Sequence, residues 1–490
     1  MPGPGGHRPV PRITGTGEPF AMLMWLRSRP WASRAIVTIA CVVVVAVQWV
    51  VIAHRRAIAP GDFDVSREFG RRFLEGQPLY EGGLHYPYLP SAALYFAPLA
   101  LVDSNLGILL RYGVAVGCLW LTLLLLHMIV RERSAQVASK RLTIGVLTLV
   151  LASQYIIRDL DDGGPHIILL AILVAGIYSV WKSRDRLGAI WFGLATALKV
   201  TPGLFLLFFI WKRQWRLAVC SSIAAACWIA LPVVWMGPSS WWSHHRQWTR
   251  IALGSVLGAR AEVAEQSELR VQNQALKPAL MRYLMTYPEG HPLRLSHPGY
   301  VPFLNLKPAT ASRLATGVML GLLAICAWQA RRRYQGSSDP AWLLEASAVL
   351  ILALLLSPVT WLQHLVLLVP ALYLIVSEDR GIRRLGTPAS AAMAAYVVLS
   401  IVLNRDLLGR ETNLLLLSYH THTLGMLLVL GVLLMWRPTA AAGGVSQERP
   451  TTAERLWPAR FMRRDRLAPA PVSDRARPDP LSALERIETR

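Results

Sequence analysis

Long apolar runs separated by short polar connections make up most of this chain. Runs close to the ~20 residues that a helix needs to cross a bilayer recur between residues 34 and 436. Because backbone polar groups in lipid must find hydrogen-bond partners within their own segment, these runs predict α-helices. The candidate spans are 34–53, 105–129, 142–158, 165–181, 186–199, 200–211, 215–236, 309–330, 341–357, 361–377, 385–403 and 414–436. The expected fold is an all-α polytopic membrane protein with about 12 (about 10–13) transmembrane helices.

Three of the apolar segments are short for an ordinary span. Residues 90–101 predict a short helix that lies in, or dips into, the outer face of the membrane. Runs 186–199 and 200–211 predict a tilted or re-entrant hairpin broken at Pro202, because proline interrupts the helical hydrogen-bond ladder.

The two ends of the chain differ from this core. Residues 1–33 are basic and rich in Gly and Pro, and residues 437–490 are rich in Arg, Pro, Ala and Glu without a sustained apolar face. Such compositions predict disordered tails. The membrane domain then covers 34–436, with two large loops at 54–104 and 237–308.

Lysine and arginine are distributed unevenly among the short connections. Connections on one predicted side of the membrane contain sixteen of them, and those on the other side contain four. Because basic connections stay on the cytoplasmic side, the asymmetry places both termini in the cytoplasm and both large loops outside. Most other polar clusters also fall outside, so we expect any chemistry on the external face.

Composition agrees with a membrane protein and explains the charge. Hydrophobic residues make up 53% of the chain and charged residues 16%, with a mean hydropathy of +0.38. The net charge of +22 comes mostly from arginines in the tails and connections, where they favour topology and contacts with anionic lipids over nucleic-acid binding. The cysteines lie inside apolar runs without metal spacing, and no P-loop, GxGxxG or HExxH motif is present. Energy-coupled transport and zinc proteolysis therefore have no support.

Asp62 is the main candidate for catalysis. It follows the first span and precedes apolar residues at helical spacing, namely Val65, Phe69, Phe73 and Leu74. This pattern predicts an amphipathic helix along the interface, which would hold the carboxylate at headgroup depth. A carboxylate placed there can accept the proton of an acceptor hydroxyl. The alternative is a solvated loop carboxylate, and Asp64 is expected to point elsewhere and to serve in substrate binding.

Three basic side chains are candidates for binding a lipid phosphate. Lys199 ends an apolar run, where snorkelling to the interface is the alternative explanation. His364 begins an apolar helix after a Pro-containing turn with an interfacial tryptophan, a position at which an ionisable group is costly. Arg158 opens the segment 158–166, which is otherwise explained as a solvated connection or a DxD-like metal site.

Aromatic and amide side chains of the external segments suit a sugar. The substrate-binding candidates besides Asp64 are Tyr86, Tyr88, Asn273, Gln274 and Trp361. In the 237–308 loop we expect short helices covering the membrane domain, because the alternating apolar runs of a β domain are missing.

Four of these stretches, taken together, resemble glycosyltransferase family 87. In chain order they are Asp62-Phe63…Gly76-Gln77-Pro78-Leu79-Tyr80…Tyr86-Pro87-Tyr88…Pro90…Pro98-Leu99, then Leu198–Pro202, Asn273-Gln274 and Leu356–His364. Asp62 falls on the family's loop aspartate, taken to be the base, and Lys199 on its Lys-x-x-Pro lysine. Trp361 and His364 fall on its Ser-Pro-x-Ser-Trp-x-His-His segment. The chain departs from the family at Ser66, where tyrosine is common, at Gln363, which replaces the first histidine, and at residues 163–166.

The resemblance implies a GT-C-type bundle with short external interfacial helices. It implies an enzyme that moves a hexose, most often mannose, from a polyprenyl-phosphate carrier to a glycolipid or glycan acceptor. Transfer would be a direct inverting displacement on the external face of a bacterial cell membrane. Asp62 would accept the proton, while Lys199, His364 and Arg158 would stabilise the leaving phosphate. Membrane lipids are further partners, and no nucleic acid is expected. No cofactor is expected, because a monophosphate leaving group does not require a metal.

Two other functions stay open at this point. A transporter or flippase of lipid-linked saccharides would need polar residues along a path through several spans. Here the polar groups gather at one face, which favours an enzyme. A lipid-binding scaffold without chemistry predicts that Asp62→Asn leaves function intact.

Overall fold

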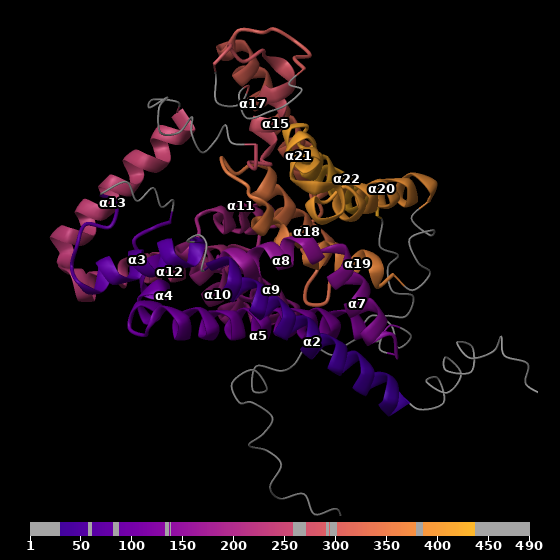
Figure 1. Cartoon of the computed structure of the whole chain (residues 1–490), viewed down its shortest axis with the longest axis horizontal. Coiled ribbons are helices and arrows are strands. Elements are labelled where there is room, and N and C mark those ends of the chain that lie inside the picture. Colours follow the sequence, from indigo (N-terminus) through magenta and orange to yellow (C-terminus); the bar gives the residue numbers. More distant parts are fainter. Residues whose placement is uncertain are drawn as a thin grey trace, which may run out of the picture. The chain divides into compact units, whose positions relative to one another are not determined.

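The computed structural model describes residues 30–56, 61–81, 88–132, 139–257, 271–290, 301–378 and 386–436, together with positions 137 and 294. Within these ranges every regular element is a helix (Figure 1), so the predicted all-α class is confirmed. The helices are α2 (Pro30–Arg56), α3 (Asp62–Leu74), α4 (Ala92–Ala100), α5 (Ser104–Arg131), α7 (Arg141–Leu151), α8 (Ser153–Asp162), α9 (His166–Trp181), α10 (Asp185–Leu198), η1 (Thr201–Gly203), α11 (Leu204–Trp211), α12 (Trp215–Ala230), α13 (Val233–Leu257), α15 (Leu276–Leu284), α17 (Pro308–Gln329), α18 (Pro340–Leu355), η2 (Leu362–Leu368), α19 (Val369–Val376), α20 (Thr387–Val397), η4 (Val398–Val402), α21 (Arg405–Ser418) and α22 (Thr421–Met435). The predicted tails lie outside the described residues, except that α2 already begins at Pro30.

Few of the described helices are long enough to cross a membrane unaided. Two helices, α5 and α17, have the length and apolar character, and the number rises to five if each bent pair forms one span. Helices α12 and α13 form one such pair, bent by 92° at Leu231-Pro232, where proline interrupts the ladder. The chain is therefore a helical membrane protein, and the predicted count of about 12 spans is not confirmed.

The amphipathic helix predicted after Asp62 is present as α3. Phe63, Phe69 and Phe73 are buried on one side, while Arg71 and Arg72 form ion pairs with Glu68 on the other. Helix α3 packs on α4, which matches the short apolar helix predicted at 90–101. Its apolar face therefore fixes the position of its first residue, Asp62.

The core around the site is formed by helices that are far apart in the sequence. Helix α9 packs between α5 and α10, and α10 packs on α12; these four helices lie side by side in Figure 1. The short helix η2 contacts α8, α9 and α18. This packing brings the segment that carries His364 against the polar end of α8 and the start of α9.

Two glycines after α8 allow close packing around the site. Gly163 has a φ of 74°, and a Cβ there would lie 2.5 Å from Cβ of Phe63. A Cβ at Gly164 would lie 2.9 Å from Nδ1 of His166. A larger residue at either position would meet another atom closely, and at Gly163 it would also adopt an unfavourable backbone conformation. Gly163 therefore allows the N-terminus of α3 to approach the end of α8, and Gly164 allows His166 and Asp159 to pack against the same turn.

Candidate active site

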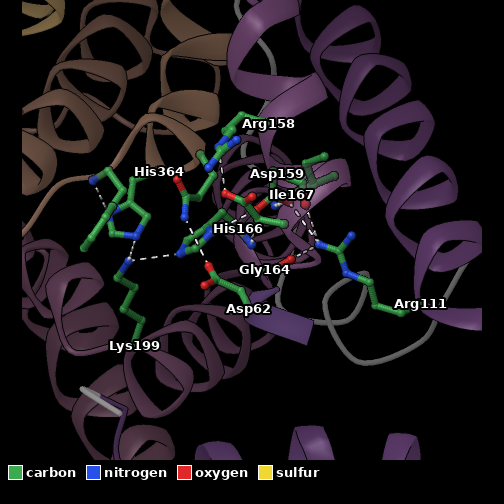
Figure 2. A network of polar contacts seen from close by, with 12 residues as sticks. Asp62, Arg111, Arg158, Asp159, Gly164, His166, Ile167, Lys199 and His364 are labelled. Carbon is green, nitrogen blue, oxygen red and sulfur yellow. Dashed lines mark hydrogen bonds and ion pairs between the residues drawn. The ribbon is translucent and has the colours of Figure 1, made fainter. Parts of the chain in front are cut away.

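Lys199 lies between two imidazoles. Its Nζ is 3.2 Å from Nε2 of His166 and 3.1 Å from Nε2 of His364, and the two rings have centroids 4.2 Å apart. Lys199 directly follows α10 in extended conformation, before the turn that contains Pro202. The break predicted between 186–199 and 200–211 is therefore the feature that directs this amine into the cluster (Figure 2).

The orientation of His166 is set by Asp159. Nδ1 of His166 lies 2.8 Å from Oδ1 of Asp159, and the main-chain N–H of Ile167 donates to Oδ2 of the same carboxylate at 3.0 Å. A carboxylate only accepts hydrogen bonds, so Nδ1 carries the ring proton and Nε2 is left as an acceptor facing Lys199. Arg111 lies 3.3 Å from Oδ2 of Asp159 and also donates to the carbonyl of Gly164. Both side chains of this ion pair are almost fully buried.

Asp62, the first residue of α3, lies beside these side chains. Together they form the polar cluster of the site, which consists of Asp62, Arg111, Asp159, His166, Lys199, Gln363 and His364. The amide Nε2 of Gln363 donates to its Oδ2 at 3.1 Å. Partial burial raises the pKa of the Asp62 carboxyl, while the Gln363 hydrogen bond lowers it. The charges of Asp159, Arg158 and Lys199 also act on Asp62. A carboxylate with a raised pKa, close to the half-buried amine of Lys199, is suited to exchange a proton with a substrate.

The two amides predicted to bind substrate hold the segment that carries Gln363 and His364. Asn273 donates to the carbonyl of Pro358 at 2.9 Å and accepts from the main-chain N–H of Thr360 at 2.9 Å. The main-chain N–H of Gln274 donates to the carbonyl of Thr360 at 2.6 Å. Both residues are fully buried. The loop before α15 therefore fixes the turn before η2, an indirect contribution to the site.

The other predicted site residues take different places. The hydroxyl of Tyr88 lies 3.2 Å from Nε2 of His166, next to Lys199. Trp361 precedes η2, and its main-chain N–H donates to Nδ1 of His364 at 3.2 Å. Arg158 forms an ion pair with Asp162 at 2.9 Å. Asp64 accepts from the main-chain N–H of Gly61 at 3.0 Å, at the start of α3, and Tyr86 lies outside the described residues.

Four residues of the cluster were not among the predicted site residues: Arg111, Asp159, His166 and Gln363. His166 and Asp159 belong to the polar segment 158–166, which was interpreted from the sequence as a solvated connection or a metal site. In the structure the two side chains form a buried pair. Gln363 was visible as a departure from the family motif. Within the described ranges, no three His, Cys, Asp or Glu side chains gather so that they could hold a metal ion.

The comparison with protein families decides the identity. The model of glycosyltransferase family 87 matches residues 86–358, more than half of the chain. The chain belongs to glycosyltransferase family 87. It is therefore a glycosyltransferase, and the family resemblance seen in the sequence is confirmed. The matched range contains Asp159, His166 and Lys199, whereas Asp62 and His364 lie outside it.

Curated relatives of this family 87 enzyme include a polyprenol-phosphate-mannose-dependent alpha-(1-2)-phosphatidylinositol mannoside mannosyltransferase of Mycobacterium tuberculosis. It is 26% identical over 77% of this chain and 86% of the relative. The protein of the same name from Mycolicibacterium smegmatis is 26% identical over 69% of this chain and 74% of the relative. A pentamannoside mannosyltransferase of Mycolicibacterium smegmatis is 25% identical over 62% of this chain and 65% of the relative. No solved structure matches the chain.

Proposed function

We propose that this glycosyltransferase transfers mannose from a polyprenyl-phosphate carrier to a glycolipid acceptor related to phosphatidylinositol mannosides. The printed names of its relatives support this donor and acceptor class. The structural observation that carries the proposal is the amine of Lys199 held between His166 and His364, with the carboxylate of Asp62 nearby. A cation and a base in one cluster are the two groups that such a transfer needs.

The cation acts on the leaving group. An ammonium has three N–H donors, and Nε2 of His166 accepts one of them, whereas His364 accepts from Trp361 at Nδ1 and carries its ring proton at Nε2. The remaining donors of the ammonium, together with the Nε2–H of His364, bind the phosphate oxygens of the lipid carrier. As the bond between the anomeric carbon and the phosphate oxygen breaks, negative charge grows on that phosphate. A fixed cation in a partly dry site stabilises this charge without reorganisation.

The base acts on the acceptor. The acceptor hydroxyl attacks the anomeric carbon from the side opposite the phosphate, its proton passes to Asp62, and polyprenyl phosphate leaves. This single displacement inverts the anomeric configuration. Tyr88 and Trp361 border the cluster and contribute to the sugar site. Arg158 assists through its charge, which acts on Asp62.

Transfer from a set of radiolabelled lipid-linked sugars tests this function. The purified enzyme in vesicles is offered polyprenyl-phosphate mannose, polyprenyl-phosphate glucose or GDP-mannose, with phosphatidylinositol mannosides as acceptors. We expect label in the glycolipid from polyprenyl-phosphate mannose, in a product of inverted anomeric configuration. Transfer from GDP-mannose alone, or a product with retained configuration, would overturn the proposal.

We further propose a GT-C-type bundle of about 12 spans in a bacterial cell membrane, with both termini cytoplasmic and the site external. The uneven distribution of basic residues supports this orientation. Single cysteines introduced by Ser243→Cys and Ser446→Cys, in a chain whose own cysteines are replaced, test it in intact cells. An impermeant thiol reagent should label the first position and not the second. Labelling at position 446 would reverse the orientation.

A further inference from the structure

The contact between Gln363 and Asp62 joins two elements that are 301 residues apart in the sequence. Gln363 lies in η2 with 6% of its surface exposed, and its Nε2 donates to Oδ2 of Asp62 at 3.1 Å. Asp62 is the first residue of α3, so its side chain leaves the helix at the end facing the cluster. Within the described part of the chain, this amide is the side chain that donates a hydrogen bond to the base.

Two other glutamines, Gln274 and Gln154, show what a purely structural role is like. The amide of Gln274 donates to the main-chain carbonyls of Val271 and Leu417, and that of Gln154 donates to the carbonyl of Ser400. These contacts satisfy the main chain where elements meet. Gln363 instead directs its donor to a carboxylate that the proposed reaction uses.

The charges around Asp62 show why a neutral donor is useful there. Asp159 and Asp162 on α8 oppose its ionisation, while Arg158 on α8 and Lys199 after α10 favour it. When the donor phosphate binds Lys199, its negative charge offsets the effect of Lys199 on Asp62. An amide N–H does not titrate and keeps its hydrogen bond in both situations.

We infer that Gln363 is the positioning residue for the base: its amide fixes the Asp62 carboxylate and keeps it ionised while the phosphate is bound. The inference rests on the proposed function, in which Asp62 accepts the acceptor proton. It also gives a role to the glutamine that replaces a histidine of the family motif, because an amide stabilises the carboxylate without competing for the proton.

The pH dependence of kcat/KM tests this role. Gln363→Met keeps the length of the side chain and removes the donor; Gln363→Glu keeps the shape and places a like charge beside Asp62. The control is Gln154→Met, which removes an amide of the same kind that lies outside the site. Folding of each variant is checked by thermal unfolding in detergent.

Asp62 must be ionised to accept a proton, so activity falls as the pH falls through its pKa. This fall is the acidic limb of the pH profile of kcat/KM. Loss of a charge-assisted hydrogen bond should move the limb of Gln363→Met to a higher pH, by about one pH unit. Below the limb, kcat/KM should then drop about 10-fold relative to the wild type, and at higher pH the difference should shrink. Gln363→Glu should show at least the same shift, and Gln154→Met none.

A pH-independent ratio between Gln363→Met and the wild type, whatever its size, would overturn the inference, because a structural defect acts equally at every pH. If Gln363→Met does not fold, the same comparison is made with Gln363→Glu. A pH-independent ratio of kcat/KM between that variant and the wild type would then overturn the inference. Failure of the wild type to transfer mannose from the lipid donor would instead contradict the proposed function.

Discussion

Replacement of Asp62 by asparagine removes the proposed base with little change in shape. The new amide side chain keeps an oxygen that can accept from the amide of Gln363, so the contact between α3 and η2 is retained. Asparagine cannot accept a proton at neutral pH. Loss of a general base lowers turnover by ~10²–10⁴-fold, which corresponds to about 2.7–5.5 kcal/mol in the activation free energy.

The assay is transfer of radiolabelled mannose from the lipid donor, with kcat and KM measured separately. We expect kcat to fall and the donor KM to stay nearly unchanged, because the lost interaction forms only in the transition state. Burial raises the pKa of Asp62. As the pH is lowered, the wild type should therefore lose activity at a higher pH than an enzyme whose base is an exposed aspartate. In Asp62→Asn the residual activity should no longer show this fall at acid pH.

Asp64→Asn is the matched control. Asp64 accepts from the main-chain N–H of Gly61, a contact that asparagine can also make, and its substitution should leave turnover close to that of the wild type. Normal turnover of Asp62→Asn would refute the assignment of the base. A larger loss from Asp64→Asn than from Asp62→Asn would transfer the role to Asp64.

Three further predictions concern the groups around the base. Lys199→Met should raise the donor KM and lower kcat/KM by about 10–100-fold, since a charge-assisted contact is worth roughly 1.5–3 kcal/mol, and unchanged donor kinetics would leave Lys199 a snorkelling residue. Asp159→Asn should destabilise the fold by about 3–5 kcal/mol in thermal or denaturant unfolding, because Arg111 then stays buried without its counter-ion, and wild-type stability would contradict the pairing. Gly163→Ala should lower stability by about 1–2 kcal/mol through its positive φ alone and should also displace Phe63, so an unfolding temperature equal to that of the wild type would contradict the close approach of α8 and α3.

Local features of the sequence were sufficient for the helical class and for several elements of the site. The apolar spacing after Asp62 predicted α3, because burial of one helix face is encoded by residues three and four positions apart. Pro202 predicted the break that places Lys199, since a proline acts on the backbone beside it. The motifs around Asp62, Lys199 and His364 also indicated the family, which the family model confirms.

Only the tertiary structure showed how these groups meet. The contact between Asp62 and Gln363, and the burial of Asp159 against Arg111 and His166, depend on helices packing across long stretches of chain. A polar residue in a connecting segment has the same local pattern whether it is solvated or buried, so sequence spacing could not separate these cases. Lys199 and His364 could be named as candidates from their own surroundings. Their 3.1 Å contact results from the packing of η2 against α8 and α9, which no local pattern specifies.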